Sequence, residues 1–377
     1  MNWRRTKAIA RKELLHIVRD IRSLILALLL PFVMLVLFGY ALSLDVDKIP
    51  TIVYDRDHTA ESRELIRQFS GTPYFNIIGY AESPADIDRS VDRSQVLLGL
   101  VINQDFGKDL RAGREAPVQL LFDGSDSNTA SIALGYADAL VQNYAFTLKS
   151  DAQIKKGGGE LKNIVEPRIR VWYNSDLKSR NYIVPGLIAV ILMIIASLLT
   201  SLTIAREWET GTMEQLLSTP VRPSELVLGK LSAFFVLGLT DLLVCLIAGV
   251  FVFDVPLRGS VLLLLASSGL FLFGALCWGV FISASTRSQL IAYQMGTLTS
   301  FLPAFLLSGF IYSIENMPVV IQVVSHVVPA RYFVSLLKAI FLKGVGWQAL
   351  WSELLFLLAY AVIVFVLASR KMRQKIA

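Results

Sequence analysis

Six apolar runs, each about as long as a membrane is thick, constrain this chain more than any other feature. A hydrocarbon layer of about 30 Å requires about 20 consecutive apolar residues in a helix. The six runs cover residues 24–44, 183–205, 231–253, 261–284, 290–314 and 350–368. Glu353 interrupts the last run near its start. The sequence therefore predicts an α-helical polytopic membrane protein with six transmembrane helices.

Basic residues flank both ends of this membrane region. Those before the first run are Arg4, Arg5, Lys7, Arg11, Lys12, Arg19 and Arg22, and those after the last are Arg370, Lys371, Arg373 and Lys375. Short flanks rich in Lys and Arg stay in the cytoplasm. An even number of spans also places both termini on one side. We therefore expect cytoplasmic termini, a cytoplasmic loop at 206–225, and an outer location for residues 45–182.

Residues 1–22 are predicted to form an amphipathic helix. At 100° per residue, Trp3, Leu14 and Ile21 share one stripe, and the basic residues fill an adjacent arc. That pattern is typical of a helix lying in the membrane interface. A solvated helix packed on the protein remains the alternative.

After the first span (23–44), residues 45–182 are predicted to form an inserted α/β domain on the outer, periplasmic side. Strand-like runs alternate with helical stretches, as in α/β layer domains. The strands are expected at 49–54, 74–80, 96–102, 117–122 and 168–173. The helices are expected at about 59–70, 84–94, 105–113 and 128–150.

The remaining residues, 183–377, are predicted to form a five-span region with an outer re-entrant segment at 315–348. Two apolar stretches in that segment are only about ten residues long, too short to cross. The predicted outer gate consists of Glu315, Asn316, Pro318, Pro329 and Arg331. Glu315 and Arg331 are expected either to pair and fix this segment or to line an exit.

The chain contains no recognisable catalytic motif. No phosphate loop, G-x-S-x-G or H-E-x-x-H occurs, and three scattered histidines predict no metal site. The net charge of +6 lies with the membrane part, where anionic lipid and topology explain it. We therefore expect a membrane-bound protein that is not an enzyme, binds no cofactor of its own and does not bind nucleic acid.

Two charged residues lie in or near the third run. Asp241 falls in mid-span, where a carboxylate costs about 2.5–3.5 kcal/mol on insertion scales and marks a candidate pathway residue. A hydrogen bond between helices, for instance with Thr240 or a serine, is the structural alternative. Lys230 lies nearer the cytoplasmic end, and its side chain is expected to snorkel to the surface.

The loop after the second run reads R-E-W-E-T-G-T-M-E-Q-L-L-S-T-P from Arg206 to Pro220. Thr212 and Gln215 have the spacing of a capping box, and Gly211 permits a sharp change of direction. Pro220 then stops the helix. The pattern predicts a short helix at 213–219 whose Met213, Leu216 and Leu217 form an apolar face. Its surroundings are acidic, which suits a basic protein partner better than lipid headgroups.

This loop resembles the cytoplasmic loop of permease subunits of type-2 ATP-binding-cassette (ABC) exporters. L-L-S-G-F-I-Y-S-I-E-N-M-P at 306–318 and V-P-A-R-Y-F at 328–333 resemble later segments of that family. The likeness extends over nearly the whole chain and is close to a bacterial drug-efflux-like subgroup with a large periplasmic domain.

The resemblance implies a permease that moves cargo, such as drugs or other amphipathic molecules, out across the bacterial inner membrane. A separate ATPase subunit, which binds ATP and Mg²⁺, would dock on the loop. A second permease copy or sister permease, and a periplasmic adaptor protein, are further implied partners. The implied coupling residues are Arg206, Glu207, Gly211, Thr212, Met213, Glu214, Gln215, Leu216, Leu217 and Pro220. A non-transporting membrane anchor or sensor, whose outer domain binds an envelope partner, remains the alternative function.

Overall fold

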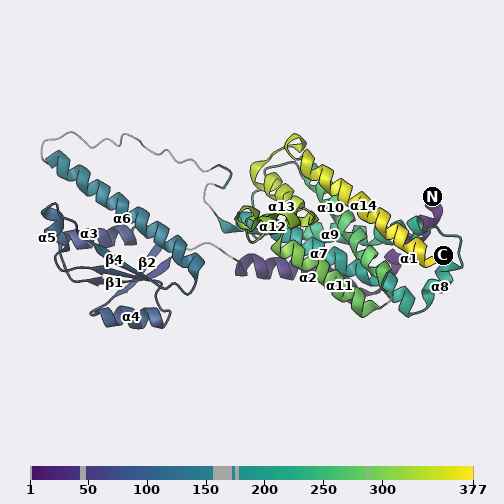
Figure 1. The fold of residues 1–377 in the computed structure, drawn as a ribbon, viewed down its shortest axis with the longest axis horizontal. Helices are drawn as coiled ribbons and strands as arrows, with labels where there is room; N and C mark the ends of the chain where they lie inside the picture. Colours follow the sequence, from purple (N-terminus) through teal and green to yellow (C-terminus); the bar gives the residue numbers. More distant parts are fainter. Residues whose placement is uncertain (1, 43–47, 156–171, 175–177, 287, 377) are drawn as a thin grey trace. The chain divides into compact units, whose positions relative to one another are not determined.

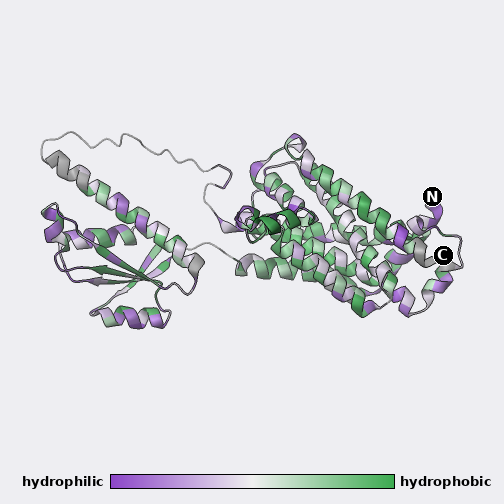
Figure 2. Ribbon diagram, viewed as in Figure 1, coloured by the Kyte–Doolittle hydropathy of each residue, from purple (hydrophilic) through white to green (hydrophobic). Residues whose placement is uncertain are grey.

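The computed structural model describes residues 2–42, 48–155, 172–174, 178–286 and 288–376. The chain divides into two compact units (Figure 1). Unit 1 combines Met1–Ser43 with Arg170–Ala377, and unit 2 is Leu44–Ile169. Figure 2 shows hydrophobic helices throughout unit 1 and a mixture of polar and apolar residues in unit 2.

Unit 2 is built on a mixed four-stranded sheet with the order β2-β1-β3-β4. The strands are β1 (Ile49–Asp55), β2 (Phe75–Tyr80), β3 (Leu98–Ile102) and β4 (Val118–Phe122). β1 runs parallel to both β2 and β3, while β4 is antiparallel to β3. These are the first four predicted strands. The fifth, at 168–173, lies mostly outside the described residues, and Trp172 and Tyr173 are not in a strand.

Four helices cover this sheet in the predicted alternation. They are α3 (Ala60–Ser70), α4 (Pro84–Asp92), α5 (Phe106–Arg111) and α6 (Ser127–Lys155). Phe69, Phe106 and Tyr144 from three of these helices join the strand residues in one core. Ile87 of α4 packs against Gly99 of β3. The alternation of strands and helices was therefore a sound basis for predicting an α/β unit.

In unit 1, four described helices are long and apolar enough to cross a membrane. They are α7 (Ser179–Glu209), α9 (Pro223–Phe251), α10 (Val261–Ser285) and the Trp351–Met372 part of α14 (Trp351–Ile376). A fifth candidate is the pair formed by Val319–Ser325 and Pro329–Lys343, which is bent by 85°. The chain is thus a mostly helical membrane protein with four or five apolar spans by this measure.

The first and fifth predicted spans are also helical. α2 (Ile21–Ala41) covers most of the first, with a described apolar stretch of Ala27–Ala41. α11 (Gln289–Leu306) ends earlier than the predicted limit of residue 314. Pro303 lies in its last turn, and Gly309 then takes a left-handed φ of 75°, which turns the chain out of the helix.

The helix predicted at the N-terminus is α1 (Trp3–Arg19). It packs on α9, and its Thr6 and Glu13 are buried. Trp3, Leu14 and Val18 remain exposed. α1 therefore combines a protein-packed face with an exposed apolar face of the kind that suits a membrane interface.

The closest helix contact in unit 1 joins α7 to α10. Thr200 of α7 donates a hydrogen bond to the Leu276 carbonyl at 3.0 Å, and the Ser283 hydroxyl accepts from the backbone N–H of Ile204 at 2.9 Å. A Cβ at Gly279 would meet the Thr200 hydroxyl and would lie 2.6 Å from the Ser197 carbonyl oxygen. Only glycine allows this approach, as in other small-residue helix contacts within membranes.

We expect Gly279→Ala to lower the melting temperature of the purified protein by several degrees, because the added methyl forces α7 and α10 apart. Gly269→Ala on the same helix is the matched control, since its nearest neighbour would lie at an ordinary 3.5 Å. Thermal unfolding of both variants measures the difference. Equal melting temperatures would contradict the close contact.

Candidate coupling site

A short helix, α8 (Thr212–Leu217), connects α7 to α9. It begins directly after Gly211, whose φ of 72° and ψ of −1° are left-handed. Residues other than glycine and, less often, asparagine or aspartate rarely adopt this conformation. Gly211 therefore allows the chain to leave α7 and enter α8 within two residues, as the sequence predicts.

The predicted capping box is wrong. Gly211, not Thr212, is the N-cap residue, and no side chain caps the helix. The Thr212 hydroxyl instead lies 3.0 Å from the Thr210 hydroxyl and donates to the Glu207 carbonyl at 3.4 Å. Thr212 is already the first helical residue, so its side chain points back to α7. The helix also begins one residue before, and ends two residues before, the predicted limits of 213 and 219.

The two faces of α8 differ in burial. Met213 is fully buried in the core of unit 1, and Leu216 packs against that core. Glu214 and Gln215 are exposed. The Leu217 side chain, predicted to share the apolar face, lies outside the described residues. α8 thus anchors itself through Met213 and presents an acidic outer surface.

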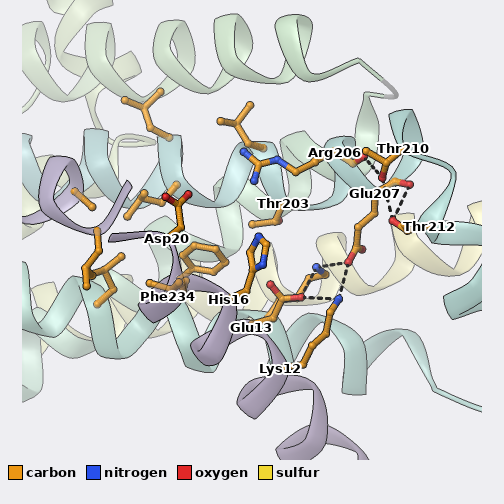
Figure 3. A pocket seen from close by; sticks show the side chains of 18 of the residues that line it. Lys12, Glu13, His16, Asp20, Thr203, Arg206, Glu207, Thr210, Thr212 and Phe234 are labelled. Atoms are coloured by element: carbon orange, nitrogen blue, oxygen red, sulfur yellow. Dashed lines mark hydrogen bonds and ion pairs between the residues drawn. The ribbon is translucent and has the colours of Figure 1, made fainter. Parts of the chain in front are cut away.

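A cluster of four charged side chains lies beside α8 and joins three helices (Figure 3). The Lys230 ammonium of α9 lies 2.8 Å from Glu207 Oε1 of α7 and 3.0 Å from Glu13 Oε1 of α1. Lys12 Nζ lies 3.3 Å from Glu13 Oε1 and 3.4 Å from Glu207 Oε1. Lys230 is only 2% exposed, Glu13 7% and Glu207 8%. We refer to these four residues as the ion cluster.

The ion cluster overturns one prediction and refines another. Lys230 does not snorkel to the surface, because two carboxylates compensate its charge inside the protein. Glu207, predicted among the acids around α8, points inward instead. Burial disfavours the charge on Glu13, but the Lys230 ammonium and then Lys12 outweigh it and hold the pKa of Glu13 below its usual value.

Further contacts tie the two ends of the α8 loop to neighbouring helices. The Arg5 guanidinium of α1 donates to the Pro220 carbonyl. At the other end, Glu209 accepts from the backbone and the side-chain amide of Gln289 in α11, both at 2.6 Å. Arg206 donates to the same Gln289 side chain at 3.4 Å. The acidic residues around α8 are Glu207, Glu209 and Glu214. Of these, only Glu214 has no side-chain bond among the described residues.

A cavity of about 680 Å³ lies next to the ion cluster. Its walls come from α1, α2, α7, α8, α9 and α11, including Thr210, Thr212, Gln215 and Leu216 at the coupling loop. Figure 3 shows His16 and Thr203 between the ion cluster on one side and Phe234 on the other. The α8 loop therefore borders a space large enough for a drug-sized molecule.

Comparison with known proteins identifies the family. The profile described as "ABC-2 family transporter protein" matches residues 21–370. The chain belongs to this family. It is 36% identical to "Probable multidrug ABC transporter permease YbhS" of Escherichia coli K12, over the whole chain and 98% of that protein. It is 30% identical to "Probable multidrug ABC transporter permease YbhR" of the same strain, over 99% of this chain and all of that protein.

A third relative, "Inner membrane transport permease YhhJ" of the same strain, is 27% identical over 87% of this chain and 86% of that protein. The chain is accordingly the permease subunit of an ABC transporter, a multi-pass membrane component distinct from the ATPase. The resemblance stated from the sequence is confirmed. An ABC permease implies an ATPase subunit as partner.

The segment at 315–348, predicted to be re-entrant on the outer side, is held by bonds other than the predicted pair. Arg331, near the start of α13 (Pro329–Lys338), donates to Ser325 Oγ at 2.6 Å and to the Gln322 carbonyl at 3.2 Å in α12 (Val319–Ser325). The Gln322 amide in turn donates to the Glu315 carbonyl at 3.3 Å. The described ion pairs do not include Glu315 with Arg331, so that predicted pair is wrong.

The other residues of the predicted outer gate lie in or next to these short helices. Glu315 and Asn316 lie in a 3₁₀ turn, Ile314–Asn316, and both are exposed. Pro318 precedes α12, while the buried Pro329 begins α13. The two short apolar stretches noted in the sequence contain the helices α12 and α13, and Arg331 holds one to the other.

Asp241 is fully buried in α9. Thr240, one predicted partner, donates instead to the Val236 carbonyl of its own helix at 3.0 Å. Neither Asp241 carboxylate oxygen has a hydrogen-bond partner among the described residues. The alternative, a hydrogen bond between helices, is therefore not found among the described residues, and the role of Asp241 as a pathway residue stays a prediction.

We expect Lys230→Met to destabilise the permease by about 3–5 kcal/mol, because it removes the buried cation and leaves two buried carboxylates with only the largely exposed Lys12 to compensate them. Lys12→Met is the matched control. The Lys12 side chain is 61% exposed, and such surface pairs contribute about 0–1 kcal/mol. Thermal unfolding in detergent compares the two variants. Similar losses for both would show that the cluster is not a buried interaction.

Proposed function

We propose that the permease exports amphipathic cargo, including drugs, and that its ATPase subunit docks on α8. The observation that carries this proposal is the build of α8 itself. A six-residue helix is held between α7 and α9 by a buried Met213, a left-handed Gly211 and an adjacent ion cluster, while Glu214 and Gln215 face outward. A connection that served only as a turn would need none of these anchors.

Force applied to α8 would reach several helices at once. Met213 lies in the unit 1 core, and Glu207 at the end of α7 is bonded to Lys230 of α9. Glu13 and Arg5 extend these bonds to α1. In this mechanism, closure of the ATPase displaces α8, and α7, α9 and α1 move with it. Cargo then leaves on the opposite side of the membrane.

For the coupling residues, we propose distinct roles. Glu214 and Gln215 contact the ATPase, Gly211 and Pro220 define the ends of the helix, and Met213, Leu216 and Leu217 hold it to the spans. Arg206, Glu207 and Thr212 join it to the neighbouring helices. Asp241 is proposed as a contact within the cargo pathway, and Glu315, Asn316, Pro318, Pro329 and Arg331 as parts of its outer gate.

We further propose that α2 and α11 cross the membrane, which gives six spans. At 1.5 Å per residue, their 21 and 18 residues are about 31 and 27 Å long, close to the hydrocarbon thickness. Both termini are then cytoplasmic in the bacterial inner membrane. Residues 1–22 lie at the cytoplasmic interface, 23–44 form the first span, 45–182 form the periplasmic domain, and 183–377 carry the other five spans.

The proposed assembly contains two permeases, either two copies of this chain or one with a sister permease, and two ATPase subunits. The similarity to both a YbhS-type and a YbhR-type permease supports the sister arrangement as one form. A periplasmic adaptor would receive cargo near the outer domain. ATP and Mg²⁺ bind the ATPase subunit, and this chain holds no cofactor.

Single cysteines test the proposed topology. Both native cysteines, Cys245 and Cys277, are buried, so background labelling is low. With the outer membrane made permeable, a membrane-impermeant maleimide is expected to label Asp88→Cys in unit 2 of intact cells. Ser218→Cys after α8 is expected to react only after lysis. Labelling of Ser218→Cys in intact cells would reverse the orientation.

Substitutions at Glu214 test whether α8 is the docking element. We expect Glu214→Lys to reduce the amount of ATPase subunit that co-purifies with the permease by about tenfold, because the exposed acid becomes a like charge for a basic partner surface. Glu82→Lys makes the same charge change on unit 2 and is the control. Undiminished co-purification of Glu214→Lys would remove the docking role.

Variants of Gly211 test the shape of α8 without changing its charge. Gly211→Val forces a β-branched residue into a left-handed conformation, whereas Gly211→Asn is tolerated there. We expect the valine variant to lose cargo-stimulated ATP hydrolysis in nanodiscs and the asparagine variant to keep most of it. If both variants hydrolyse ATP like wild type, α8 is only a turn.

A further inference from the structure

The cavity beside the ion cluster has two chemically different ends. Its apolar wall is made of side chains from three helices, α2, α7 and α9, namely Leu24, Ala27, Leu198, Leu199, Leu202 and Phe234. The other end is formed by the ion cluster, together with His16 and the Thr203 side chain. Figure 3 shows the ring of Phe234 and the charges of the ion cluster on opposite sides of His16, with the Asp20 carboxylate on the Phe234 side. Such a space fits a molecule that is itself apolar at one end and polar at the other.

Glu207 supplies an unused acceptor at the polar end. Its Oε1 atom accepts from both Lys230 and Lys12. Its Oε2 atom is buried and has no hydrogen-bond partner among the described residues. Buried acceptors of this kind are costly unless a donor reaches them, and a bond to a charged group is stronger than one to a neutral group. Glu207 also lines the cavity, so a bound molecule is the donor that this geometry accommodates.

We propose that the cavity binds an amphipathic cationic amine whose N–H donates to Glu207 Oε2. The apolar body of the ligand lies along Leu198, Leu202 and Phe234. That such an amine is a cargo molecule rests on the proposed function; that it binds here does not.

The charges at the cavity do not oppose a cation. The lining holds three cations, Lys12, Arg206 and Lys230, and three carboxylates, Glu13, Asp20 and Glu207, so its formal charges balance. An anionic headgroup would bring its charge against the unpaired Glu207 oxygen. A cation that lacks an N–H would leave this oxygen unsatisfied. The N–H donor, and not the charge alone, therefore distinguishes a ligand of this cavity from other cations.

Two dyes of similar size separate these features. Rhodamine 6G is an amphipathic cation with N–H donors, while tetramethylrhodamine ethyl ester carries the same charge without a donor. We expect the permease in nanodiscs, without its ATPase subunit, to bind rhodamine 6G about tenfold more tightly, as measured by fluorescence polarisation. Equal affinities would overturn the role of the Glu207 acceptor and make the cavity a nonspecific or lipid-filled space.

Three variants locate the site. Leu202→Trp fills the apolar end and is expected to weaken rhodamine 6G binding at least about tenfold, while Leu243→Trp, on an exposed part of α9 outside the cavity, leaves it unchanged. Glu207→Gln keeps the side-chain size and is expected to reduce the affinity for rhodamine 6G to that for the donor-free dye. Wild-type binding by Leu202→Trp would place the dye elsewhere and overturn the proposal, whether or not Glu207→Gln folds.

This test and the test of coupling can fail separately. Dye binding is measured without the ATPase, and Glu214→Lys is expected to bind rhodamine 6G like wild type even where it loses the ATPase. A permease that couples to its ATPase but binds both dyes equally would refute the amine site alone. One that binds rhodamine 6G selectively but keeps its ATPase in Glu214→Lys would refute the docking role of α8 alone.

Discussion

The pairing of the buried Lys230 ammonium with two carboxylates determines how the helices of unit 1 meet beside α8. A charge that is 2% exposed is tolerated only when opposite charges and hydrogen bonds surround it. Glu207 supplies one partner from α7 and Glu13 another from α1. Three helices that are distant in sequence must therefore meet at one point. Because α8 begins five residues after Glu207, its position is determined by the same bonds.

The contact between α7 and α10 extends this constraint along unit 1. Thr200 and Ser283 join the two helices through side-chain-to-backbone bonds, and Gly279 lets their backbones approach. Packed helices with such bonds move as bodies and do not deform continuously. A displacement of α8 would therefore be carried by α7 together with α10. In the proposed mechanism, the ion cluster would receive the movement of α8, and the contact between α7 and α10 would transmit it.

Local signals in the sequence predicted most elements, because each depends on neighbouring residues. Gly211 and Pro220 locate the short helix, and alternating apolar runs locate four strands of unit 2. The ion cluster could not be predicted from such local signals. Lys230 is 217 residues from Glu13, and the side chain of a lysine near the end of an apolar run ordinarily snorkels to the surface. The capping box failed for a related reason. Thr212 and Gln215 have the right spacing, but the left-handed Gly211 already makes the turn and the Thr212 hydroxyl is engaged by α7.

One oxygen of Glu207 and both oxygens of Asp241 lack hydrogen-bond partners among the described residues, and one ligand chemistry satisfies both side chains. Glu207 lies beside α8, next to Lys230, while Asp241 lies eleven residues further along α9, about 16 Å at the rise of a helix. A neutral apolar molecule would leave these acceptors unsatisfied. A cationic amine offers an N–H donor to each. If the cavity takes amines as proposed, the burial of Asp241 without a partner is consistent with a second contact for the same class of cargo, deeper in the membrane.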